Sequence, residues 1–153
     1  MMSHDEPLLD ALRSMWDAAD PSPPDLATRA LFRLALEDLD VEVMALQAEL
    51  SGAGARGPEL ASTIIFESQS LALTIMISAA GRSRRRLDGW ITPSAALVVR
   101  LHAAGGILEE TADDDGRFAF ADVAEGVVHL TVEPTGGAAL HLARQVATPP
   151  ITI

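Results

Sequence analysis

Between residues 62 and 153, short apolar runs alternate with turn residues, and this pattern limits the folds open to the chain more than any other feature. The runs are rich in Ile, Leu, Val, Thr and Phe, and Gly, Asp or Pro residues separate them. Such spacing, without helical segments in between, predicts an antiparallel β-sandwich of seven or eight short strands and disfavours a doubly wound α/β fold. The predicted strands are Thr63–Glu67, Leu71–Ser78, Arg84–Thr92, Ala96–Ala103, Ile107–Thr111, Arg117–Ala121, Val127–Val132 and Leu140–Val146.

The N-terminal part has a helical pattern instead. Leu8, Leu12, Met15 and Trp16 follow the spacing of one helix face, and this helix should end before Pro21. Beyond the proline-rich break, a second helix is expected to run to residue 50, because its apolar residues step by four and three. These residues are Phe32, Leu36, Leu39, Val43, Leu46 and Leu50.

One part of the second helix has an alternative interpretation. Leu39, Val41, Val43 and Ala45 also alternate with Asp40, Glu42 and Met44, which is the pattern of a strand over residues 39–46. The length of the periodic segment favours a helix, since it exceeds ten residues.

Composition divides the chain in the same way. Residues 1–61 carry 12 acidic and 4 basic side chains, whereas residues 62–153 carry 10 acidic and 7 basic ones, so most of the net charge of −11 belongs to the first part. A small, Gly-rich stretch at residues 51–58 is typical of a linker. The prediction is therefore an α+β protein with an acidic helical segment (1–50), a linker (51–61) and a β-sandwich domain (62–153).

Two resemblances come from short motifs. The stretch Asp115-Gly-Arg-Phe-Ala-Phe120, followed by Val123-Ala-Glu-Gly126, makes residues 84–133 resemble a carboxypeptidase regulatory-like domain, a transthyretin-like β-sandwich. That resemblance implies a structural or adhesive module without catalytic residues. The acidic helical N-terminus with Pro-Pro-Asp-Leu26, together with Leu-Asp-Gly-Trp90 and a closing Thr-Pro149, loosely resembles small cytoplasmic proteins associated with sigma factors. This second resemblance implies a regulatory role.

Several aromatic and basic residues have expected places. Phe118 and Phe120 should point to one face of their strand, into the core, and Trp90 should also be a core residue. Trp16 fits equally well as a core residue or as an exposed anchor for a partner. The Arg82–Arg86 cluster should protect an edge strand from aggregation, or else bind an acidic partner, a phosphate or the acidic helices of the same chain.

Composition and motifs argue against most chemistries. The chain has no Cys, its four His are isolated, and it lacks phosphate-binding glycine loops and nucleophile elbows. The Asp113–Asp115 run departs from a calcium-loop pattern. We therefore expect no metal, no cofactor and no enzyme activity. The acidic charge and the few aromatic residues predict no direct nucleic-acid binding. The apolar runs are too short for a membrane span. The N-terminus lacks the pattern of a signal peptide, which predicts a cytoplasmic protein.

The function that these observations favour is binding of a protein partner with a basic surface, in the manner of a soluble anti-sigma factor that masks a transcription factor. An amphipathic helix would place its apolar face in a groove while its carboxylates steer the encounter. The predicted contact residues are Leu8, Leu12, Trp16, Phe32, Asp38, Asp40 and Glu42. The alternative is a β-sandwich module that binds a peptide or carbohydrate, with helices that serve packing or dimerisation.

Overall fold

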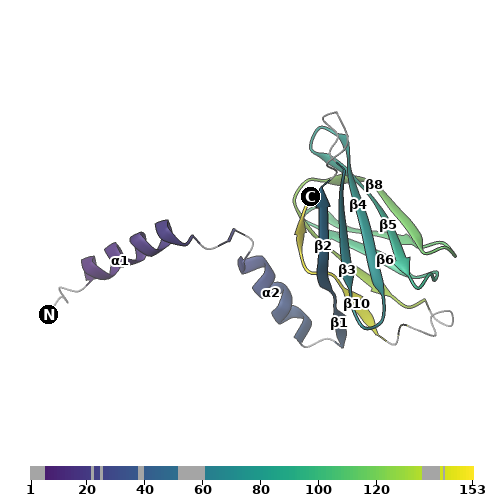
Figure 1. The fold of residues 1–153 in the computed structure, drawn as a ribbon, viewed down its shortest axis with the longest axis horizontal. Helices are drawn as coiled ribbons and strands as arrows, with labels where there is room; N and C mark the ends of the chain where they lie inside the picture. Colours follow the sequence, from purple (N-terminus) through teal and green to yellow (C-terminus); the bar gives the residue numbers. More distant parts are fainter. Residues whose placement is uncertain are drawn as a thin grey trace.

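Two helices and eleven strands make up the part of the chain that the structure, a computed structural model, describes (Figure 1). That part comprises residues 6–21, 23–24, 26–37, 40–51, 61–135, 142 and 144–153. The elements are α1 (Glu6–Ala19), α2 (Leu26–Glu37), β1 (Val41–Val43), β2 (Ala45–Ser51), β3 (Ser62–Glu67), β4 (Ala72–Gly81), β5 (Arg84–Thr92), β6 (Val98–Ala103), β7 (Gly106–Thr111), β8 (Arg117–Ala124), β9 (Val127–Glu133), β10 (Gln145–Ala147) and β11 (Ile151–Thr152).

The strands form two sheets, so the protein is α+β with a β-rich body. One sheet has the order β2-β3-β4-β5-β8, and the other has the order β1-β10-β9-β6-β7, with β11 paired to β9 beside β10. The pairings are antiparallel, as predicted, except that β1 runs parallel to β10.

Both sheets contribute alternate apolar side chains to one buried cluster. Burying this apolar area is the main favourable term in the stability of the body. Phe118 and Phe120 lie in the cluster, as predicted, with ring centroids 5.8 Å apart in an edge-to-face arrangement. The largest fully buried side chains are Phe66, Leu73, Ile75, Leu87, Ile91, Leu101, Leu130, Val99, Val123, Val128, Val132 and Val146.

The prediction of a helix up to residue 50 is wrong, because residues 41–51 form β1 and β2. The alternative interpretation, a strand over residues 39–46, is closer, since the described part of that range contains β1 and the start of β2. β1 pairs with β10, and β2 pairs with β3 in the other sheet, so the chain changes sheet at Met44. Met44 is buried, and its N–H donates to the Ala147 carbonyl at 2.8 Å. Pairing with distant strands decides the conformation where local periodicity fits two structures.

Seven of the eight predicted strands correspond to β3–β9, and β5 has the predicted bounds. The last prediction, Leu140–Val146, overlaps only β10, and residues 140, 141 and 143 lie outside the described residues. The eleven strands of the described residues exceed the prediction because β1 and β2 lie where a helix is predicted and because no strand is predicted at residues 151–152, which form β11. Pro149 and Pro150 lie between β10 and β11, where they cannot donate ladder hydrogen bonds.

Two expectations about β5 are wrong. Trp90 is half-buried on the outer face of its sheet, opposite Thr74 and Arg117, because Gly89 and Ile91 take the inner face. The strand also lies between β4 and β8, so the arginines at its start do not protect a sheet edge.

Candidate protein-binding surface

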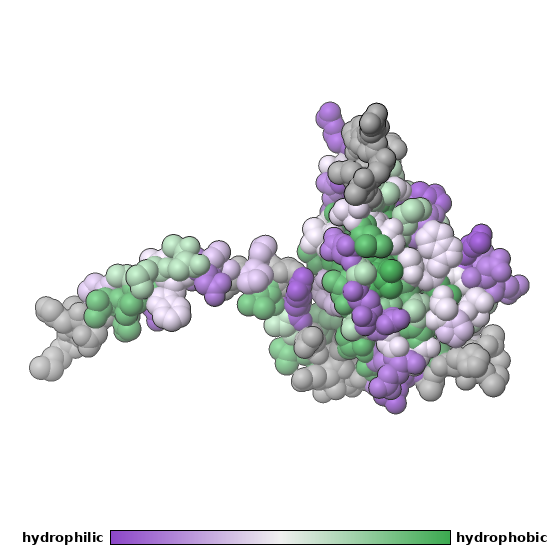
Figure 2. Space-filling model, in the orientation of Figure 1, coloured by the Kyte–Doolittle hydropathy of each residue, from purple (hydrophilic) through white to green (hydrophobic). Residues whose placement is uncertain are grey.

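The apolar face of α1 is open to solvent. No residue of α1 is buried, and Figure 1 shows the helix projecting away from the β body. Trp16 is 67 % exposed and Leu8 is 63 % exposed, values that a core residue would not have. Figure 2 shows apolar residues at the surface of this helix. Its large exposed apolar residues are Leu8, Leu9, Leu12, Met15 and Trp16.

Acidic side chains complete the surface of α1. Glu6, Asp10 and Asp17 outnumber the single base, Arg13, which gives the helix a net charge of −2. The Arg13 guanidinium contacts the Asp10 carboxylate at 3.0 Å, in a highly exposed pair. Such a pair contributes little to stability, so the helix offers carboxylates beside a continuous apolar stripe.

The second helix lies between α1 and the body (Figure 1). Phe32 faces the body, and its ring centroid is 4.6 Å from that of His129 on β9. Phe32 is therefore half-buried rather than presented to a partner. Three apolar residues of α2 outside the predicted contact residues are exposed, and the spacing of Leu31 and Leu34 on one helix face was an available signal. They are Leu26, Leu31 and Leu34.

The two predicted acidic contacts that the structure describes, Asp40 and Glu42, lie apart from the stripe of α1. Asp38 lies outside the described residues. Asp40 is exposed before β1, where its carboxylate contacts the Arg144 guanidinium at 3.0 Å. Glu42 accepts hydrogen bonds from the Ser70 N–H at 2.9 Å and from the Ser70 hydroxyl at 2.5 Å.

The hydrogen bonds to Glu42 define its role in the fold. Burial alone would raise the pKa of this carboxyl, but hydrogen bonds from Ser68, Ser70 and the backbone of residues 69–70 outweigh that effect and lower the pKa. Glu42 thus fixes the turn between β3 and β4 to β1. The predicted contact residues that the structure describes therefore fall into separate groups. Leu8, Leu12 and Trp16 lie on α1, whereas Phe32 lies on α2 and the two carboxylates lie at β1.

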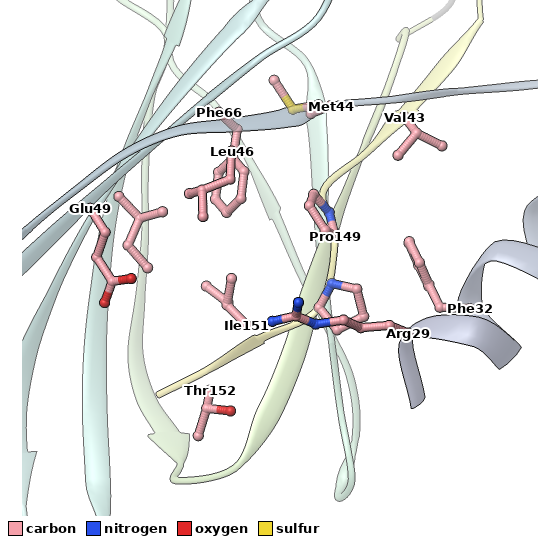
Figure 3. A pocket seen from close by; sticks show the side chains of 12 residues that line it. Arg29, Phe32, Val43, Met44, Leu46, Glu49, Phe66, Pro149, Ile151 and Thr152 are labelled. Carbon is pink, nitrogen blue, oxygen red and sulfur yellow. The ribbon is translucent and has the colours of Figure 1, made fainter. Parts of the chain in front are cut away.

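A groove of about 450 Å³ lies between α2 and the part of the body that contains β2 and β11 (Figure 3). Its walls are mainly apolar, while Arg29 of α2 and Glu49 of β2 supply charged groups on opposite sides. This groove could not be predicted from the sequence, since its walls come from distant parts of the chain. The other lining residues are Phe32, Val43, Met44, Leu46, Ile64, Phe66, Pro149, Pro150, Ile151 and Thr152.

The arginine cluster is largely paired within the body. Arg84 contacts Asp122 at 3.5 Å and Arg85 contacts Glu125 at 2.5 Å. The Arg86 guanidinium donates two hydrogen bonds to Asp88, which raise the pKa of Arg86. These ion pairs leave less charge for an acidic partner than the sequence alone suggests.

Two further findings concern metals and membranes. Among the described residues, no three His, Asp or Glu side chains lie close enough together to hold a metal ion. Neither of the two described helices is long and apolar enough to cross a bilayer.

Comparisons with family models, with curated proteins and with solved structures found no match. The resemblances to a carboxypeptidase regulatory-like domain and to sigma-associated proteins therefore stay predictions.

Proposed function

We propose that this protein is a non-enzymatic regulator that binds a protein partner through α1. The observation that carries the proposal is the exposure of Leu8, Leu12 and Trp16 along one face of this helix. Contiguous apolar patches on a protein surface mark interaction sites. A helix of 14 residues is marginal in water by itself, so seating its apolar face on a partner would also stabilise the helix.

The chemistry of α1 favours a partner with an apolar groove and a basic rim. The stripe would enter the groove, and Glu6, Asp10 and Asp17 would attract Arg and Lys side chains around it. A sigma factor has such a basic face where it contacts DNA, and masking that face is the anti-sigma type of regulation that we propose. Such a partner would place the protein in the cytoplasm.

Trp16→Ala in the full chain should weaken binding of the partner about 30-fold, since truncating a hot-spot aromatic costs ~2 kcal/mol. Alanine has the highest helix propensity, so the substitution keeps the helix. The partner would first be captured on the wild-type protein from cells of its own source and identified, and affinities would then be measured by titration calorimetry.

Ile107→Ala on β7 is the matched control, because Ile107 is 60 % exposed and lies on the body. It should leave the affinity unchanged. Raising the salt concentration should slow association with the wild-type protein, because carboxylates steer the encounter. Equal affinities of the Trp16→Ala and wild-type proteins would rule out α1 as the contact.

The groove beside α2 favours a second candidate function, the binding of an apolar peptide or small ligand by the body. Its volume of about 450 Å³ is within the range of ligand pockets, and its walls are mainly apolar. In that case Leu46→Gln, which alters one wall of the groove, should reduce binding while Trp16→Ala has no effect.

A further inference from the structure

Two histidines of different strands form a stacked pair on the outer face of the sheet that contains β6 and β9. His102 and His129 are direct neighbours in the register of these strands. Their ring centroids are 4.4 Å apart, and their planes differ by only 5°. The His102 Nε2 lies 3.0 Å from the Thr131 hydroxyl, which holds one ring of the pair in place.

Helix α2 covers this pair through Phe32. The Phe32 ring lies on the His129 ring at a centroid distance of 4.6 Å and an angle of 60°. The rings of Phe32, His129 and His102 thus form a row to which α2, β9 and β6 each contribute one ring. Leu26, Leu31 and Leu34 of the same helix are exposed. Phe32 therefore supplies an aromatic contact between α2 and the body, on the ring of His129.

The charged groups around His102 and His129 stabilise a protonated imidazole only weakly. Arg100 lies on the same face of β6 as His102, and its guanidinium is engaged by Glu109 of β7 and Glu133 of β9. Glu133 also accepts a hydrogen bond from the Gln145 amide at 3.0 Å. On the side of α2, Arg29 lines the groove beside Phe32. A protonated imidazole would therefore be repelled by these cations. The carboxylates nearby are already paired with Arg100, so they would stabilise the added charge little.

We propose that the stacked pair His102–His129 and Phe32 form an acid-sensitive latch, which holds α2 on the body at neutral pH and releases it when the imidazoles are protonated. A charged His129 needs water that Phe32 keeps away, and two charged stacked rings repel each other. The proposal concerns how the N-terminal helices are attached, so it holds whether or not α1 binds the partner proposed above.

The titration of the histidines has the direction that a latch requires. Burial, followed by the charge of His102, lowers the pKa of His129 to about 4. Burial, followed by the charge of Arg100, lowers the pKa of His102, although Glu133 opposes this effect. Release of α2 exposes His129 and lets its pKa rise toward the ordinary value of about 6.5. Protonation therefore favours release, and the latch weakens as the pH falls from about 6.5 toward 4.

A pair of spin labels on the full chain tests the latch directly. The chain has no Cys, so Leu31→Cys on α2 and Ile107→Cys on β7 would be the only labelling sites, and both positions are exposed. Double electron–electron resonance at pH 7.5 should give one narrow distance distribution. At pH 5 the constant for docking of α2 should be about 30-fold lower, and a broad component at longer distances should appear.

His129→Phe in the doubly labelled chain provides the control, because it keeps an aromatic ring under Phe32 and removes the titrating group. This variant should keep the narrow distribution at pH 5, whereas Phe32→Ala should give the broad one already at pH 7.5. Far-UV circular dichroism would verify that the sheets stay folded at both pH values. A wild-type distribution that is the same at both pH values, or that becomes narrower at pH 5, would overturn the proposal, as would an unchanged acid response in His129→Phe.

Discussion

Replacing Phe118 by alanine should lower the free energy of unfolding by about 3–5 kcal/mol, which is the usual cost of truncating a buried aromatic side chain. The Phe118 ring is buried between the sheets and packs edge-to-face on Phe120. Removal of the ring leaves a cavity that rigid strands on both sides cannot close. Urea unfolding followed by circular dichroism would measure the change.

Asp114→Ala is the matched control from the same hairpin. Asp114 is exposed, whereas the turn is held by the Asp113 carboxylate, which accepts the N–H of Asp115 at 3.0 Å and the N–H of Arg117 at 2.8 Å. The control should therefore change the free energy of unfolding by less than ~0.5 kcal/mol. Similar losses for Phe118→Ala and Asp114→Ala would mean that the inner face of β8 is wrongly assigned.

Gly89→Ala should destabilise the protein by about 3 kcal/mol, because the position has no room for a side chain. Gly89 lies opposite Phe118 in the pairing of β5 with β8. A Cβ atom on Gly89 would lie 2.0 Å from the tip of the Phe118 ring and about as close to its neighbouring ring atoms, at 2.4 and 2.5 Å. The ring would have to leave its place in a densely packed core.

The same clash predicts strong coupling between the two positions. With Phe118→Ala already present, the space above residue 89 is empty, and alanine is better suited to a strand than glycine. Gly89→Ala should then cost less than ~1 kcal/mol or even stabilise the variant. Additive losses in urea unfolding of the single and double variants would show that Phe118 does not lie on Gly89.

The strands could be predicted where turn chemistry marks their ends. Arg84–Thr92 coincides with β5, because a turn precedes it and Pro93 follows it. Residues 41–51 could not be assigned in the same way, since a helical pattern runs to residue 50 and an alternating pattern fits residues 39–46 as well. What decides their structure is the pairing of β1 with β10, about a hundred residues away, and of β2 with β3 in the other sheet, and no local pattern contains that information.

The candidate site was predictable only in part. The apolar stripe of α1 is visible from residue spacing, but an amphipathic helix has the same pattern whether it packs on its own body or faces solvent. Burial decides between these cases, and it places Trp16 among the exposed residues. The histidine pair could not be predicted, because His102 and His129 become neighbours only through the register of β6 with β9.

The most direct test of the central claim compares the full chain with a shorter chain that begins at residue 40 and contains β1–β11 without α1 and α2. Circular dichroism would first verify that the shorter chain forms its sheets. Both would then be titrated with the partner captured on the wild-type protein. Our account predicts that the full chain binds and that the shorter chain does not; equal affinities would contradict it and assign binding to the body.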